Sequence, residues 1–527
     1  MTLEQQSTYD VVIVGGGIAG LTAAYMLRDQ EVLLLERTKR LGGRVETVSF
    51  GDTTLNIGTQ FFNEEDTSFV HLIDELGIER TPHRGGSSPY ALHLDGELLD
   101  DFGFLLRPKN LFHLIRMFSA MYRAAKTFEL PSDDPRWREL MNTNLAELQQ
   151  GYPPEVLSVV NTYMRGACVA KPVRTAGGVG ALLTFDVIAE LSFAEGGTER
   201  ITDELAHRLG DRVVTSAEVL EVIDHGDTVS TRYRHDGDEF TVTSKAVVMA
   251  APPAAVVETV VDLPAATRHA LESVNWGPII VVSVFLDPGF TWPNWVGILC
   301  DDAIFPGLID ATYDQELGPD ESVIYNCFVS VPPDETALIA ELGAKTDEEL
   351  AEAVLTDLRR VLDGHDVDKF VRDTMVTRYM DGELELSPEY YLEVLPHLEK
   401  PIGNIYLCGD YTHRTSFLAG AAHSAFRAAR ALGSTHVVSE VDEIIYPRPP
   451  RWGRFGIAAL TITGAVGLAG IAGGGASGAA IAVPAVLLFG STAAWPSFLP
   501  PRQEVYKGIL AAGTGLGAAA LAIGLWG

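Results

Sequence analysis

The sequence predicts an α/β protein in which a doubly wound domain is interleaved with an α+β domain and followed by a C-terminal helical membrane segment. Three observations predict this architecture. An apolar strand, a glycine-rich turn and a helical pattern open the chain, as at the start of a doubly wound sheet. Short alternating strands and helical stretches fill the middle of the chain. Residues 454–527 contain three long apolar runs with almost no charge, as bilayer-spanning helices do.

Both of the larger domains are expected to be discontinuous, since 527 residues are too many for a single core. The chain should pass from one domain to the other several times before it reaches the tail. The predicted boundaries are 1–85, 191–265 and 396–435 for the doubly wound domain, 86–190 and 266–395 for the α+β domain, 436–453 for a linker, and 454–527 for three transmembrane helices.

The turn after the first predicted strand, Asp10–Val14, supplies Gly15, Gly17 and Gly20 in a GxGxxG spacing. In this motif the first glycine permits a tight turn, the second lets the backbone approach a pyrophosphate, and the third lets the helix pack close to the strand. The helix N-terminus then faces the anion. Glu36 ends the second strand about 20 residues downstream, where a carboxylate holds ribose hydroxyls. The chain is therefore predicted to bind a dinucleotide. The other contacts predicted here are Ile18, Ala19 and Arg37.

The residues that follow Glu36 resemble a known family. In ERTKRLGGRV, Gly42, Gly43 and Arg44 are similar to the RxGGR element of the FAD-dependent amine oxidase superfamily. That superfamily includes monoamine and polyamine oxidases, protoporphyrinogen oxidases, and the phytoene and ζ-carotene desaturases. The similarity covers about residues 8–435. Its further motifs are LNIGTQFF at 55–62, FAEGGTERITDELA at 193–206, Val219, and the closing motif at 405–432.

The resemblance implies that the cofactor is FAD. In the family, the position of Val219 gives a backbone contact to adenine, and the positions of Gly409 and Asp410 contact the second phosphate and the ribityl chain. The segment at 55–62 passes beside the flavin ring in related proteins. The other positions that the resemblance assigns to FAD are Gly58, Thr59, Gln60, Leu418 and Ala421.

The substrate side departs from the pattern of the amine oxidases in this superfamily. They carry a lysine that holds a water near flavin N5, whereas the similar strand here, WGPIIVVSVFLDPGF, places Ile280 or Val281 at that position. Phe417 stands where their aromatic cage has a tyrosine. GDYT at 409–412 also resembles the plant-type carotene desaturases and hydroxysqualene dehydroxylase. These differences predict an apolar pocket at Ile280, Val281 and Phe417 and a likeness to the desaturase-type members. No residue is assigned to catalysis.

Composition limits the partners. The formal net charge of −32 argues against nucleic acid, because phosphate binding needs clusters of Lys and Arg. The four cysteines have no paired metal-ligand spacing, so buried thiols and no metal site are expected. The N-terminus has no basic n-region and no apolar h-region, so no signal peptide is expected. His413 and His423, which flank the closing motif, are expected to be structural.

The tail predicts a multi-pass membrane anchor. Its apolar runs are Phe455–Ala472, Ala479–Ala494 and Gly508–Trp526. Arginines precede the first run, and Arg502 and Lys507 separate the second from the third. The positive-inside rule then places the catalytic domain in the cytoplasm.

A second candidate for lipid contact is the helix predicted over Arg107–Phe128. No acidic residue interrupts it, so it is either a basic amphipathic helix lying on anionic lipid or an ordinary surface helix. Its predicted apolar face consists of Leu111, Leu114, Ile115, Phe118, Tyr122 and Ala125, and its basic residues are Lys109, Arg116, Arg123 and Lys126.

Together these features predict a membrane-anchored oxidoreductase in which FAD accepts a hydride from a lipophilic substrate of isoprenoid or polyene type. A site tethered at the bilayer can take such a substrate without passage through water. There is no second GxGxxG in a strand-turn-helix context, so oxygen or a membrane quinone is the expected electron acceptor. Two alternatives remain open: an FAD-dependent amine oxidase acting on a small amine, and a non-catalytic flavin-bearing membrane scaffold.

Overall fold

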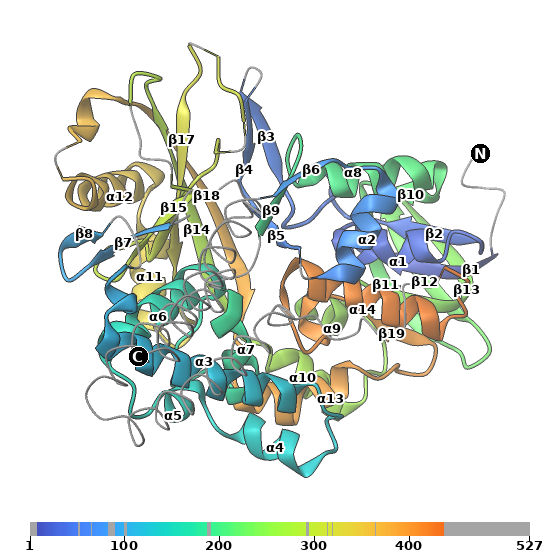
Figure 1. Ribbon diagram of the computed structural model, residues 1–527. Helices are drawn as coiled ribbons and strands as arrows, with labels where there is room; N and C mark the ends of the chain where they lie inside the picture. Colours follow the sequence, from blue (N-terminus) through green and yellow to red (C-terminus); the bar gives the residue numbers. More distant parts are fainter. Residues whose placement is uncertain are drawn as a thin grey trace, which may run out of the picture. The chain divides into compact units, whose positions relative to one another are not determined.

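Two seven-stranded sheets, built from alternating parts of the chain, organise the computed structural model (Figure 1). The structure describes residues 8–50, 53–64, 66–82, 90–99, 103–186, 191–290, 295–313, 315–318, 320–363 and 365–436. These residues belong to one compact unit. A second unit, residues 84–89 and 447–527, lies outside the described part of the chain.

The first sheet has the strand order β10-β2-β1-β13-β12-β11, with β19 paired to β13. Its strands are β1 (Thr8–Val14), β2 (Val32–Leu35), β10 (Val213–Val214), β11 (Ala217–Asp224), β12 (Val229–His235), β13 (Asp238–Met249) and β19 (Ile405–Leu407). β1 lies parallel to both β2 and β13, and β19 lies parallel to β13. The predicted α/β fold with a strand-turn-helix-strand opening is therefore confirmed.

The carboxyl ends of four parallel strands lie in register at one edge of this sheet. Val14 is aligned with Leu35 and Met249, and Met249 is aligned with Leu407. The residues that follow these strands therefore meet at one place. Ligands of open α/β sheets bind outside the carboxyl ends of the strands.

Helix α1 (Ile18–Met26) connects β1 to β2 and is buried along its whole length. It packs against α14 (Phe417–Ala431) and α8 (Glu199–Leu209), and α2 (Thr67–Leu76) completes the same hydrophobic core (Figure 1). A helix that is apolar all round is stable only when it is enclosed in this way. Distant parts of the chain thus fix the helix whose N-terminus faces the predicted cofactor.

The second sheet has the order β18-β14-β17-β16-β15-β7-β8. Its strands are β7 (Tyr90–Leu94), β8 (Glu97–Leu99), β14 (Trp276–Leu286), β15 (Gly297–Cys300), β16 (Gly307–Asp310), β17 (Val323–Ser330) and β18 (Val371–Leu384). Residues Ile280, Val282, Val284 and Leu286 of β14 share a core with α11 (Thr336–Ala344) and α12 (Asp347–Val361). Because side chains alternate along a strand, the intervening residues of β14 point to the opposite face of the sheet.

Two small sheets and eight further α-helices belong to the described unit. The small sheets are β3 (Thr47–Phe50) with β4 (Thr53–Asn56), and β5 (Phe62–Asn63) with β9 (Leu191–Ala194) and β6 (Arg80–Pro82). The remaining α-helices are α3 (Pro108–Phe128), α4 (Pro135–Asn142), α5 (Leu145–Leu148), α6 (Pro154–Cys168), α7 (Gly177–Asp186), α9 (Pro253–Thr259), α10 (Ala265–Glu272) and α13 (Leu395–Leu398). All four cysteines are buried and free of disulfides, as predicted.

The predicted helix over Arg107–Phe128 is present as α3, but its buried face differs from the predicted one. The buried apolar residues are Leu114, Met117, Met121, Ala125 and Phe128, and Leu111, Ile115, Phe118 and Tyr122 are only partly covered. The helix packs on α7, where the ring of Phe118 lies edge-on to that of Phe185, and its buried face includes two methionines that the sequence pattern had not included. Its basic residues also have protein partners, since Lys109 lies 3.7 Å from Glu155 and Arg116 stacks over the ring of Tyr152. Contact of α3 with lipid stays a prediction.

Within the residues that the structure describes, no helix is both long enough and apolar enough to cross a bilayer. The three predicted spans, Phe455–Ala472, Ala479–Ala494 and Gly508–Trp526, lie outside those residues. The predicted linker at 436–453 lies outside them as well, apart from its first residue.

Candidate active site

The turn between β1 and α1 has room for a ligand at Gly17 and at neither of the other two glycines of the motif. A Cβ on Gly15 would lie 2.3 Å from the carbonyl oxygen of Ala250, and one on Gly20 would lie 1.9 Å from the carbonyl oxygen of Gly15. A Cβ on Gly17 would meet no atom within 4 Å. Gly17 is also the N-cap of α1, and no side chain caps that end of the helix. The open space therefore lies where backbone amides and the helix dipole favour a pyrophosphate.

Glu36 is held at the same turn. Its Oε2 accepts a hydrogen bond from the Gly16 amide at 2.7 Å, and its Oε1 accepts from the amide and the hydroxyl of Thr38 at 2.7 and 2.8 Å. The Ala217 amide donates to the Glu36 backbone carbonyl at 2.8 Å, which holds the start of β11, two residues before Val219, against the end of β2. This places Glu36 and Val219 together on the side expected for ribose and adenine. Arg37 next to them is exposed, while Ile18 and Ala19 are buried in the first turn of α1.

The RLGGR segment joins this turn to the closing motif. The Gly42 amide donates to the Gly16 carbonyl at 2.8 Å, and the next residue, Gly43, carries the chain on to Arg44. The Arg44 guanidinium donates to Oδ1 of Asp410 at 2.7 Å, across 366 positions of the sequence. Asp410 is buried at the start of a short 3₁₀ turn. The two segments that the resemblance assigned to FAD are therefore in direct contact.

The closing motif continues into α14. The Gly409 amide donates to the Ser424 hydroxyl at 2.8 Å, which ties the 3₁₀ turn to the helix. Leu418 and Ala421 lie in the first turns of α14, and Ala421 is buried against α1. The N-terminal ends of α1 and α14 are thereby brought to the same edge of the first sheet.

The segment Gly58–Gln60 connects the cofactor side to the second sheet. A Cβ on Gly58 would lie 2.0 Å from the carbonyl oxygen of Arg44, and the Thr59 amide donates to that carbonyl at 3.1 Å. Oε1 of Gln60 accepts from Nδ2 of Asn326 at 2.9 Å. Oδ1 of Asn326 accepts in turn from the Ser283 hydroxyl of β14 at 2.7 Å. This buried amide chain fixes the segment on the face of β14 that points away from α11 and α12.

Comparison with known proteins agrees with this geometry. The sequence model of the family described as flavin containing amine oxidoreductase matches residues 18–433. The chain belongs to that family. It is accordingly an FAD-dependent oxidoreductase, and the predictions of the family and of FAD are confirmed. The match ends before the predicted membrane spans.

Relatives and solved structures extend the likeness. The chain is 23% identical to the probable flavin-containing monoamine oxidase A of Dictyostelium discoideum, over 80% of this chain and 97% of that protein. It is 24% identical to amine oxidase B of Sus scrofa, over 83% and 88% of the two chains. Putrescine oxidase bound to putrescine has the same fold, with a TM-score of 0.66 at 19% identity over 81% of this chain and 99% of that chain. Cyclohexylamine oxidase from Brevibacterium oxydans has a TM-score of 0.65 at 18% identity over 80% and 98%. The predicted likeness to the desaturase-type members stays a prediction.

In this member of the amine oxidoreductase family, the two pocket candidates on β14 point in opposite directions. Ile280 packs into the core with α11 and α12, so its side chain lies behind the sheet. Val281 is on the same face as Ser283, and it pairs with Phe328 of β17 and Thr377 of β18. Only Val281 therefore remains a candidate for the substrate side.

Glu383 is a site residue that the sequence analysis did not identify. It lies near the end of β18, is 8% exposed, and pairs with Gly277 of β14. Its Oε1 accepts hydrogen bonds from the Ser416 hydroxyl at 2.9 Å and from the Leu384 amide at 3.2 Å. Burial raises the pKa of the Glu383 carboxyl to about 8, and the charge of Asp410 adds to the rise, while Arg44 and these hydrogen bonds oppose it.

The backbone beside Glu383 is strained. Ser416 and Phe417 have φ values of +27° and +60°, although neither residue is glycine. Such conformations cost on the order of 1–3 kcal/mol each and gather at functional sites. Phe417, the third predicted pocket residue, is thus fixed next to the hydroxyl that donates to Glu383.

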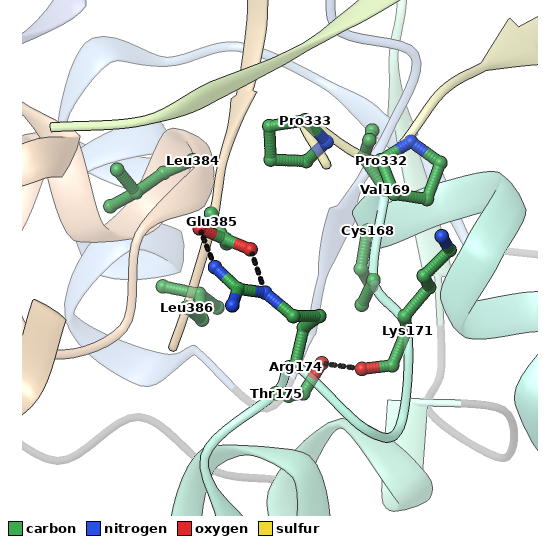
Figure 2. Close-up of a pocket in the computed structure, with 11 residues that line it drawn as sticks. Cys168, Val169, Lys171, Arg174, Thr175, Pro332, Pro333, Leu384, Glu385 and Leu386 are labelled. Carbon is green, nitrogen blue, oxygen red and sulfur yellow. Dashed lines mark hydrogen bonds and ion pairs between the residues drawn. The ribbon is translucent and has the colours of Figure 1, made fainter. Parts of the chain in front are cut away.

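Figure 2 shows a small pocket at the end of β18, lined by residues from the end of α6, from the loop before α7, from the chain after β17 and from the last residue of β18 with the two that follow it. Within it, Arg174 donates to both carboxylate oxygens of Glu385 at 2.8 and 3.0 Å. This bidentate pair holds the chain that leaves β18 and so fixes the position of Glu383.

The two histidines of the closing motif are buried and hydrogen-bonded. Nε2 of His423 lies 3.1 Å from Oδ1 of Asp66, and Nδ1 of His413 lies 2.9 Å from the Thr415 hydroxyl. Burial, followed by the neighbouring His423, lowers the pKa of His413 well below its usual range, so this ring is neutral. These contacts account for both rings without a catalytic role.

We expect Glu36→Gln and Asp410→Asn to weaken FAD retention. Hydrogen bonds to a charged group contribute about 1.5–3 kcal/mol, so each variant should bind FAD about tenfold or more weakly. The measurement is the dissociation constant from titrating FAD into FAD-depleted protein, with exposed Glu79→Gln as the matched control. Affinities equal to those of the control would remove Glu36 or Asp410 from the cofactor site.

Glu383→Gln should become more stable, relative to the wild type, as pH rises. The folded-state pKa of about 8 lies above the ordinary value of 4.5. Ionisation of Glu383 therefore takes nothing from the wild type's free energy of unfolding below pH 4.5, and its destabilising effect is complete above pH 8. Between these limits the variant should gain roughly 1.4 kcal/mol in free energy of unfolding for each pH unit. Urea unfolding at several pH values measures this, with exposed Asp381→Asn as control. A stability difference that does not change with pH would show that Glu383 titrates normally.

Proposed function

We propose that the chain oxidises an amine at the carbon beside its nitrogen, with bound FAD accepting the hydride and oxygen or a quinone as the final electron acceptor. The observation that carries this proposal is the extent of the likeness. Proteins named as monoamine, putrescine and cyclohexylamine oxidases match about four-fifths of the chain, including both the cofactor side and the substrate side.

This proposal replaces the substrate class that the sequence favoured. A lipophilic isoprenoid or polyene was expected because Val281 and Phe417 are apolar, and the comparisons support the amine alternative instead. The apolar residues are compatible with both. The absence of a lysine at Val281 and of a tyrosine at Phe417 does not decide whether the substrate carries a nitrogen.

An apolar cluster on the substrate side favours an amine with an apolar substituent. It contains buried Tyr90, Leu191, Phe193, Val296 and Ile309, with partly buried Phe61, Tyr313 and Phe328 packed against them. Phe61 follows Gln60 directly, and Phe328 is the strand partner of Val281. The cluster therefore adjoins the segment that passes the flavin, where a hydrocarbon group would be removed from water.

The tasks of the chain's own residues follow from their positions. Gly17 and the N-terminus of α1 would hold the pyrophosphate, and Glu36 the ribose. Gly58–Gln60, fixed by Asn326, would support the flavin and set its distance from β14. Hydride removal from carbon depends chiefly on this placement.

We expect anaerobic addition of benzylamine, cyclohexylamine or putrescine to bleach the flavin absorbance of the holoenzyme. Two electrons leave the amine, which becomes an imine and hydrolyses to a carbonyl compound, so one carbonyl should form per flavin reduced. With oxygen as acceptor, each O2 consumed should give one H2O2. Dithionite reduction is the control that the bound flavin is reducible.

The same experiment separates the alternatives. Bleaching by an isoprenoid alkene in detergent, with no response to any amine, would support the polyene substrate. A flavin that dithionite reduces, and that no amine or polyene reduces, would support a non-catalytic scaffold.

Attachment to membrane lipid through residues 454–527 is a separate part of the proposal. A chain ending at Tyr446 retains the whole first unit, so it should keep its flavin and move from the membrane pellet to the supernatant. If it still pellets, charge reversals at Lys109, Arg116 and Arg123 distinguish lipid binding by α3 from aggregation. Recovery of the full chain in the supernatant after the membranes are pelleted would contradict the anchor.

A further inference from the structure

The carboxyl of Glu383 lies where three parts of the proposed site meet. Arg44 donates to the carbonyl of the preceding residue, Gly382, at 3.0 Å and also to Asp410. The Ser416 hydroxyl, from the residue before Phe417, donates to Glu383 itself. The carboxyl therefore stands between two cofactor segments and the pocket residue Phe417.

This carboxyl has no cation of its own within the described residues. Arg44 forms its ion pair with Asp410, and its charge acts on Glu383 only from beyond ion-pair distance. Glu385, two residues further along the chain, is neutralised as buried structural acids usually are, by a bidentate pair with Arg174. Burying an acid without such a partner costs free energy and raises its pKa, and groups of this kind are concentrated at functional sites.

One oxygen of the carboxyl remains available to a ligand. Both hydrogen bonds that the described residues donate to this carboxyl fall on Oε1, and Oε2 accepts none from them. The hydroxyl that orients Oε1 belongs to strained Ser416, so the surrounding structure holds this arrangement against a local cost.

We propose that Glu383 is the residue that recognises the amine, pairing through Oε2 with the substrate ammonium and then accepting one proton from it. The proton passes from nitrogen to Oε2, which leaves a neutral amine and a neutral carboxyl, and no electrons are exchanged in this step. This inference rests on the proposed amine oxidation. It names the group that selects for a cation in an otherwise apolar site.

The raised pKa of Glu383 suits both pairing with the ammonium and accepting its proton. A carboxyl of pKa about 8 holds a proton from an ammonium far better than one of ordinary pKa 4.5. The charged or titratable groups that act on Glu383 are Asp410 on the 3₁₀ turn, Arg44 after β2 and Cys168 at the end of α6. Burial raises the pKa of the Cys168 thiol well above its usual value, so Cys168 stays neutral near pH 8.

The test compares a cation with its uncharged isostere. Benzyltrimethylammonium can be neither oxidised nor deprotonated, and neopentylbenzene has the same shape without charge. Holoenzyme is titrated with each probe between pH 6 and 9.5 and followed by the flavin difference spectrum. We expect about tenfold preference for the cation at pH 9, lost on acidification below pH 8.

Glu383→Gln should abolish this preference at every pH, and Asp381→Asn, which removes a nearby exposed carboxylate, should retain it. Flavin reduction by a primary amine should fall about 100-fold in Glu383→Gln, while reoxidation by oxygen is unchanged. An attraction to aromatic rings alone would leave the preference independent of pH and of Glu383. A Glu383→Gln enzyme with wild-type preference and pH profile would overturn the inference.

The outcomes separate this inference from the proposed function. If amines reduce the flavin equally in the wild type and Glu383→Gln, the inference fails and amine oxidation stands. If no amine reduces the wild type and the cation preference still depends on Glu383, amine oxidation fails and cation recognition stands. If Glu383→Gln loses FAD, the same titrations are made with Glu383→Asp, which keeps the charge one methylene further back. A cation preference that still depends on pH but is weaker than in the wild type supports the proposal. A preference equal to that of the wild type overturns it.

Discussion

The ion pair between Arg44 and Asp410 is the constraint on which the rest of the site depends. It joins the loop after β2 to the turn after β19, and Arg44 also holds the carbonyl of Gly382 at the end of β18. One guanidinium therefore links both sheets. Arg44 suits this position because its planar fork can serve a carboxylate and a carbonyl at the same time. This contact therefore fixes the positions of both the buried Glu383 carboxyl and the open turn at Gly17.

Much of the cofactor side was predictable from sequence because its signals are local. β1, the glycine turn, α1 and β2 follow one another directly in the sequence. Each glycine of the motif is required for a steric reason, so the motif can be recognised from sequence. The closing motif at 405–432 is also contiguous, so Asp410 and Leu418 could be named in advance. Sequence order alone did not reveal that Arg44 and Asp410 touch.

The substrate side was less predictable, because it depends on which face each strand turns inward. Ile280 and Val281 are equivalent in an apolar run, and only the packing of α11 and α12 shows that Ile280 faces away. Glu383 could not be identified from the sequence for a related reason. In DGELELSPE, acids alternate with leucines in an acidic chain, which is typical of a solvent-exposed strand edge. Burial of that acid follows from residues far away in the sequence, such as Ser416.

The enclosure of α1 has a consequence for the synthesis of the chain. This helix is buried on all sides, and one wall of its burial is α14, which begins at Phe417. At about 5–20 residues per second, a ribosome needs roughly 20–80 s to proceed from one helix to the other. During that interval the nascent chain carries an apolar helix that is only partly covered and a parallel sheet that lacks β19. The first unit can therefore close only after β19 and α14 have been synthesised, and until then its N-terminal portion exposes apolar surface that the finished unit buries.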